Sequence, residues 1–172
     1  LTLLEAVSHR QAALVARWLG VGFIHGVMNT DNMSLSGETI DYGPAAYLDG
    51  YDPQKKFSYI DRQGRYAYGN QPAIAQWNLA RLAEAMLPLI AKGEGGDRDR
   101  AVQTAEEILD RFADRFEGER DQVFGRKLGF DSPVDGVRPL YEGFLELLEK
   151  ENTDFTVAFR RLAESASPAG KE

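Results

Sequence analysis

The sequence contains no cysteine and only two histidines. The lack of cysteine excludes disulfide bonds, zinc–thiolate sites and thiol nucleophiles, and it suits a reducing compartment. No apolar run is long enough to span a bilayer. The formal net charge of −7 also leaves little clustered positive charge for phosphate groups. These features argue against nucleic acid and membrane as the main partners.

The length of 172 residues is typical of a single domain with a real hydrophobic core. The chain starts at Leu1 inside a helical pattern, so we expect it to be a piece of a longer protein. Apolar residues recur at helical spacing and predict helices over 1–19, 72–91, 100–125, 137–150 and 154–163, with a charged connector at 92–99 and a frayed end at 165–172. The helix over 72–91 is apolar on more than one face. We therefore expect it to be among the most buried elements, with Trp77 and Leu82 in the core and the 1–19 helix nearby.

A polar stretch separates the first two predicted helices and reads HGVMNTDNMSLSGETIDYGP over 25–44. Within it, residues 33–35 and 39–41 flank Ser36-Gly37-Glu38, a pattern that predicts a short β-hairpin with glycine at the turn. The irregular segment that follows is rich in Tyr, Gly, Asp and Pro, and long segments of this kind are usually functional. The sequence therefore predicts a mainly α fold with a small β-hairpin beside the polar stretch.

The hairpin would bring Asn32, just before its first strand, close to Asp41, at the end of its second. Oxygen atoms of amides and carboxylates suit Mg²⁺. His25 precedes Asn32 by the seven positions of the protein-kinase H-R-D-x-x-x-x-N loop, and Asp41-Tyr42-Gly43 stands in the place of D-F-G. The order of elements thus predicts a protein-kinase-like C-lobe.

One position departs from the kinase pattern. Val27 occupies the place of the catalytic aspartate, and valine cannot accept a proton. The nearest carboxylate belongs to Asp31, next to Asn32. Either Asp31 replaces the missing base, or the fold lacks kinase chemistry.

The motif HGVMNTDN, followed by TIDYGP and YDP, resembles the selenoprotein O family (SelO, also called YdiU), which has a kinase-like fold. The resemblance is densest over 23–53 and extends through FSYIDRQGRYAYGNQP into the helix at 76–87. It implies a protein adenylyltransferase that transfers AMP from ATP to Ser, Thr or Tyr hydroxyls of proteins. By motif position, Asp31 would accept the proton, and Asn32 and Asp41 would bind Mg²⁺, with Asp41 also reaching the nucleotide phosphates.

The resemblance also implies missing parts. Family members are longer and have an N-lobe whose glycine-rich cover and basic residues hold ATP, so we expect a C-lobe fragment that is inactive alone. Its parts would be a site hairpin over 23–44, an activation-segment-like loop over 43–71 and a helical remainder over 72–164. The expected partners are ATP, protein substrates and the N-lobe of the parent chain, in a cytoplasmic, bacterial setting.

Other interpretations remain open at this stage. Asp31, Asn32 and Asp41 could simply stabilise turns, as Asn and Asp often do. We assign His25 and Asn29 to bracing the loop and not to catalysis. The alternatives in function are a kinase-like phosphotransferase that uses Asp31, and a catalytically dead pseudokinase module that binds nucleotide or partner proteins.

Overall fold

Helices make up most of the protein. The computed structural model describes residues 2–166 and contains α1 (Leu3–Gly20), α2 (Gln71–Gly93), α3 (Arg98–Lys127), α4 (Val137–Lys150) and α5 (Phe155–Ala166). The mainly helical prediction is confirmed, and each helix boundary lies within three residues of its expected place. Residues 165 and 166 continue α5, while the rest of the expected frayed end lies outside the described residues. No helix between residues 2 and 166 is both long enough and apolar enough to cross a membrane.

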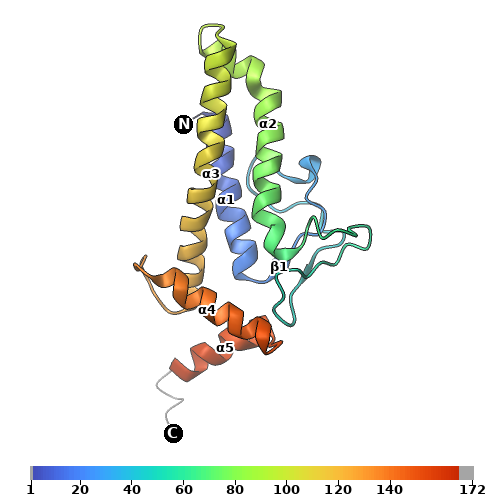
Figure 1. The fold of residues 1–172 in the computed structure, drawn as a ribbon, viewed down its shortest axis with the longest axis vertical. Helices are drawn as coiled ribbons and strands as arrows, with labels where there is room; N and C mark the ends of the chain where they lie inside the picture. Colours follow the sequence, from blue (N-terminus) through green and yellow to red (C-terminus); the bar gives the residue numbers. More distant parts are fainter. Residues whose placement is uncertain (1, 167–172) are drawn as a thin grey trace.

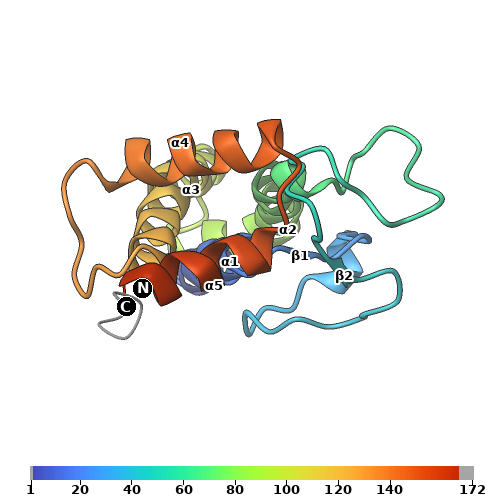
Figure 2. The same cartoon turned by 90° about the horizontal axis from the view of Figure 1, so that it is seen from below.

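The three longest helices lie side by side, and α1 contacts both α2 and α3, as Figure 1 shows. The shorter helices α4 and α5 lie across the lower end of this layer (Figures 1 and 2). The long connection between α1 and α2 projects from one side of the molecule, beside α2. It contains the polar stretch, so the candidate site rests on the helical layer without being part of it.

Local sequence features explain how α1 begins and why it packs closely. The Thr2 hydroxyl accepts a hydrogen bond from the Glu5 backbone N–H at 3.3 Å and caps the first turn. At the other end, a Cβ atom on Gly20 would clash with the Val123 side chain of α3. Glycine at this position therefore lets the two helices come together.

An aromatic cluster joins the lower end of α3 to α4 and α5. The rings of Phe124 and Tyr141 stack with centroids 4.8 Å apart, and Phe155 and Phe159 meet edge to face at 5.1 Å. The Lys127 ammonium lies 4.1 Å from the Phe159 ring centroid, and its burial lowers the pKa of this lysine. These contacts fix the two short helices against the layer.

The expectation that α2 is among the most buried elements, with Trp77 and Leu82 in the core, is wrong. Trp77 is 42% exposed, and Leu82 is only partly buried. Two guanidinium groups cover the indole ring, with Arg65 at 4.7 Å and Arg81 at 5.2 Å from its centroid. Cation–π contact with arginine stabilises an aromatic ring at the surface, so Trp77 is stabilised there without burial in the core.

The predicted hairpin is only partly present. The sheet of the structure pairs β1 (Phe23–Ile24) with β2 (Ala46–Tyr47), antiparallel, with Phe23 opposite Tyr47. The predicted strands at 33–35 and 39–41 reduce to a single bridge between Met33 and Thr39. Side chains of α1 form hydrogen bonds with several polar groups of this segment, as described below. These bonds satisfy groups that would otherwise pair between the two strands of a longer hairpin. The likeness of the whole to a kinase C-lobe stays a prediction.

Candidate functional site

Asp31 and Asn32 lie on a short 3-10 turn, η1 (Thr30–Asn32). The Asp31 side chain is exposed. The Asn32 amide nitrogen donates a hydrogen bond to the Val27 carbonyl oxygen at 3.0 Å. Because this bond uses the amide nitrogen, the amide oxygen Oδ1 is the atom that could bind a ligand.

His25 connects the start of the loop to the segment that carries Asp41. Its side chain is fully buried, and its Nδ1 accepts a 3.4 Å hydrogen bond from the Val27 backbone N–H. The proton therefore lies on Nε2, which donates to the Ile40 carbonyl oxygen at 2.8 Å. The next residue, Asp41, has a positive φ of 54°. This arrangement agrees with the bracing role expected for His25.

The two candidate metal ligands are therefore anchored to the same three residues. Asn32 binds the carbonyl of Val27, and His25 holds the peptide immediately before Asp41. A non-glycine residue at positive φ is uncommon and costs free energy, which the surrounding contacts must offset. The structure thus ties Asn32 and Asp41 to one short segment and places Asp31 directly beside Asn32.

Two amide side chains of α2 hold this loop in place. Gln71 is fully buried; its oxygen accepts from the His25 N–H at 3.0 Å, and its nitrogen donates to the Phe23 carbonyl at 3.0 Å. Asn78 donates to the Met28 carbonyl at 3.0 Å. Neither residue was predicted from the sequence. The signal was present, because Asn78 shares the helical face of buried Ala75, Leu79 and Ala83, where an amide needs a specific partner.

Side chains of α1 hold the segment between Asn32 and Asp41. Gln11 donates to the Ser34 carbonyl at 2.6 Å, and the Trp18 indole N–H donates to the Thr39 hydroxyl at 2.9 Å. These bonds join a long helix to both sides of the turn. The turn therefore has a fixed position relative to the helical layer.

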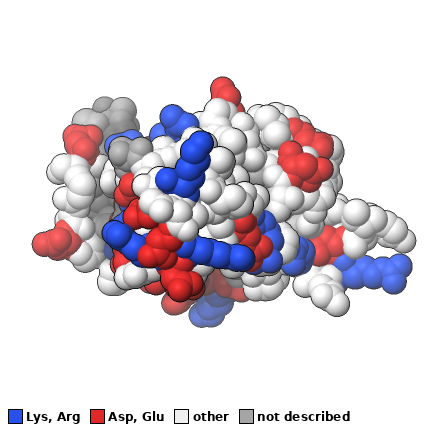
Figure 3. Space-filling view, turned by 90° about the horizontal axis from the view of Figure 1, so that it is seen from above, with Lys and Arg blue, Asp and Glu red and all other residues white. Residues whose placement is uncertain are grey.

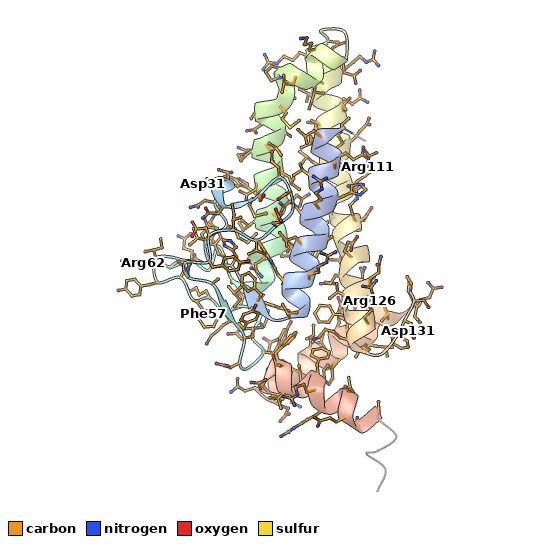
Figure 4. The ribbon with its side chains drawn as sticks, turned by 180° about the vertical axis from the view of Figure 1, so that it is seen from behind. Asp31, Phe57, Arg62, Arg111, Arg126 and Asp131 are labelled. Atoms are coloured by element: carbon orange, nitrogen blue, oxygen red, sulfur yellow. The ribbon has the colours of Figure 1, made fainter. Side chains whose placement is uncertain are left out.

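The irregular loop before α2 is also connected to the site. The Tyr66 hydroxyl donates to the Asn29 side-chain oxygen at 2.7 Å, in agreement with the bracing role expected for Asn29. Further along, the Tyr68 hydroxyl donates to the Leu19 carbonyl at 2.6 Å, and burial raises the pKa of Tyr68. Figure 4 shows Asp31 on the same side of the helices as Phe57 and Arg62 of this loop.

The donor set at the site fits a hard, oxygen-binding cation. Across residues 2–166 there is no group of three or more His, Cys, Asp or Glu side chains that could hold a metal ion. By residue type, Asn32 and Asp41 would supply one amide and one carboxylate oxygen, with the remaining positions left to water or phosphate oxygens. This is the ligand pattern that Mg²⁺ usually adopts beside nucleotides, so the residues present fit the ion.

Comparison with known proteins decides the family. The model of the family "Protein adenylyltransferase SelO" matches residues 2–172. The chain belongs to the SelO family. It is 56% identical over 168 residues to the protein nucleotidyltransferase YdiU of Methylorubrum populi, covering 98% of this chain and 33% of the relative. The YdiU proteins of Bradyrhizobium sp. strain BTAi1 and Rhizobium etli strain CFN 42 are 54% identical over 164 residues and 51% identical over 170 residues.

The SelO match confirms the resemblance seen in the polar stretch and extends it to the helices beyond residue 95, which sequence motifs do not cover. These relatives are named protein nucleotidyltransferases, so the chain belongs to a nucleotidyltransferase family. It spans about a third of their length: this chain covers 33% of the M. populi, Bradyrhizobium and R. etli proteins.

Proposed function

We propose that this chain carries the catalytic segment of a protein adenylyltransferase, which transfers AMP from ATP to Ser, Thr or Tyr hydroxyls of proteins. The observation that carries the proposal is the joint anchoring of Asn32 and Asp41 to the segment from His25 to Val27, with Asp31 beside them. The family's description as a protein adenylyltransferase supports the same reaction.

Asp31 is the proposed proton acceptor. Its exposed carboxylate is open to a large protein substrate, whereas Val27 has no group that can accept a proton. The acceptor hydroxyl gives its proton to Asp31 while its oxygen forms a bond to the α-phosphorus of ATP. The bond from that phosphorus to the bridging oxygen breaks, and pyrophosphate leaves with the electron pair.

Asn32 and Asp41 would hold Mg²⁺ through Oδ1 of the amide and through the carboxylate. When bound, the ion offsets the negative charge of the phosphate oxygens. The hydrogen bond from Asn32 to Val27 and the bond from His25 to Ile40 keep the two ligands in position. Positioning and electrostatic stabilisation supply most of the catalysis in such transfers.

We expect this chain alone to transfer AMP poorly. It spans about a third of its relatives, and the proposal assigns the cover over the nucleotide phosphates to an N-lobe of a longer parent. Mg²⁺ gives up its waters reluctantly and is usually held with substrate phosphates, so an exposed Asn–Asp pair alone binds it weakly. We also propose that the parent works in the bacterial cytoplasm.

The position of the transferred label tests the proposal. The full-length parent is incubated with a general protein acceptor and with ATP labelled at either the α or the γ phosphate, and the 172-residue chain is assayed beside it. We expect protein labelling by the parent from the α position only. Labelling from the γ position would instead indicate a phosphotransferase. Labelling from neither, with nucleotide still bound, would indicate a binding module.

A further inference from the structure

The loop over 53–69 exposes large apolar side chains at its tip. Tyr59 is 95% exposed, Ile60 is 80% exposed and Phe57 is 38% exposed. The loop projects from the side of the molecule in Figures 1 and 2, away from the helical layer. Two adjacent apolar side chains with this exposure contribute almost nothing to the core of this chain, so they are available to another surface.

The backbone beneath these side chains is held by specific hydrogen bonds. Asp61 is buried, and its two carboxylate oxygens accept the backbone N–H groups of Arg65 and Tyr66, each at 2.8 Å. The Lys56 ammonium donates to the Arg62 carbonyl at 2.7 Å, and Asn70 donates to the Gly64 carbonyl at 2.7 Å. These internal hydrogen bonds hold the backbone of the loop without a partner, and such preorganisation reduces the entropy cost of binding.

The charge of this loop is opposite to that of the whole chain. Residues 54–66 contain four cationic side chains and one carboxylate, that of buried Asp61, for a net charge of +3 in a chain of −7. Among the described residues, no ion pair involves the lysines and arginines of this stretch, which are Lys55, Lys56, Arg62 and Arg65. In Figure 3, Lys and Arg side chains lie at the end of the projecting loop.

The loop is also joined to the candidate site. Tyr66, at its base, binds the side chain of Asn29, two residues before Asp31. Figure 4 shows Asp31, Phe57 and Arg62 on one side of the helices. A protein held at the tip would therefore lie on the side of the molecule that carries the proposed proton acceptor.

We propose that the tip surface binds an acidic, apolar-containing segment of the protein acceptor. The tip surface is defined by its exposed aromatic, aliphatic and cationic side chains, Lys55, Phe57, Tyr59, Ile60, Arg62 and Arg65. Carboxylates of the acceptor pair with the cations, and an apolar side chain packs on Tyr59 and Ile60. This inference rests on the proposed function, because it names the acceptor class.

Peptide binding without ATP tests the tip surface. The fluorescein-labelled probe is the peptide Glu-Asp-Leu-Glu-Phe-Glu-Asp, and its control peptide has lysine at every acidic position. Fluorescence anisotropy with the 172-residue chain should show binding of the acidic peptide only, weakening as salt is added. The double change Tyr59→Ser with Ile60→Ser, and separately Arg62→Glu, should each raise Kd about tenfold or more. The matched changes Leu89→Ser and Arg98→Glu, at exposed positions near the junction of α2 and α3, should leave Kd unchanged.

Several outcomes would overturn the inference. Equal binding by the tip variants and the unchanged chain would do so, as would equal binding of both peptides. Binding to phosphatidylserine vesicles with no binding to the acidic peptide would assign the tip to a membrane. The same changes can be made in the full-length parent. If these variants keep the KM for the protein acceptor and still transfer label from the α position, docking at the tip is refuted and the proposed transfer is not.

Discussion

At the scale of single residues, Val27 contributes to the candidate site through its backbone alone. Its side chain cannot donate or accept a proton. Its backbone carbonyl accepts a hydrogen bond from the Asn32 side chain, and its backbone N–H donates one to the His25 ring. Both bonds depend on the backbone of residue 27 and not on its side chain. The candidate metal ligands are therefore held without a carboxylate at residue 27, and the proposed proton acceptor is Asp31.

The change Asp31→Asn tests this assignment in the full-length parent. Asparagine keeps the size of the side chain but cannot accept the proton, so we expect the rate of α-label transfer to fall by about 10²- to 10⁴-fold. Because Asp31 is exposed, the thermal unfolding midpoint should stay close to that of the unchanged protein.

The control for this change is Asp49→Asn, at another exposed carboxylate of the same long connection. It should leave the transfer rate unchanged. A rate for the Asp31 variant within about threefold of the parent would show that the proton goes elsewhere, since a general base contributes far more than this.

At the scale of elements, the first residue of α2 connects that helix to strand β1. The Gln71 side chain bonds both the His25 N–H and the Phe23 carbonyl, as a neighbouring strand would. The change Gln71→Met leaves both buried groups without partners. We expect the free energy of unfolding to fall by about 2–4 kcal/mol, because each unsatisfied buried group costs about 1–3 kcal/mol.

Urea denaturation of the 172-residue chain measures this effect. The matched change Gln63→Met, at an exposed glutamine of the projecting loop, should shift the unfolding free energy by less than about 0.5 kcal/mol. Similar small shifts for both variants would show that the hydrogen bonds of Gln71 contribute little to holding the loop.

The same elements show what the sequence could predict. Helical spacing located all five helices because their buried faces are apolar. Motif spacing singled out Asp31, Asn32 and Asp41 as candidate site residues, and their roles stay predictions. Helical spacing places Arg81 one turn from Trp77, but it could not show that Arg65 of the irregular loop before α2 also covers the ring. It also missed Gln71 and the other amides, because their partners are backbone groups whose positions depend on the fold.

At the scale of the whole molecule, Tyr51 connects the long loop to α5. Its ring stacks on Phe155 with centroids 5.9 Å apart, and burial, with a smaller effect of Glu149, raises the pKa of Tyr51 to about 12. The unfolded chain loses this proton near pH 10 and the folded chain only near pH 12. The stability due to this group is therefore complete below pH 10 and is lost as the pH rises toward 12.

Urea midpoints measured at pH 9 and pH 11 test this expectation. For Tyr51 alone the loss at pH 11 is about 1 kcal/mol, and burial raises the pKa of Tyr68 in the same direction. The change Tyr51→Phe should make the fall smaller, because phenylalanine has no proton to lose. A midpoint equal at both pH values would contradict the assignment of these buried tyrosines.

We propose that Asn32 and Asp41 hold the metal while Asp31 faces the reacting phosphate. The most direct measurement is a crystal structure of the full-length parent with Mn²⁺ and a non-hydrolysable ATP analogue, with Mn²⁺ located by its anomalous scattering. We predict one Mn²⁺ within about 2–2.5 Å of the Asn32 Oδ1 and of an Asp41 carboxylate oxygen. The Asp31 carboxylate should lie on the side of the α-phosphorus opposite the leaving pyrophosphate. A metal bound by other residues, with Asn32 and Asp41 pointing away from the nucleotide, would contradict these roles.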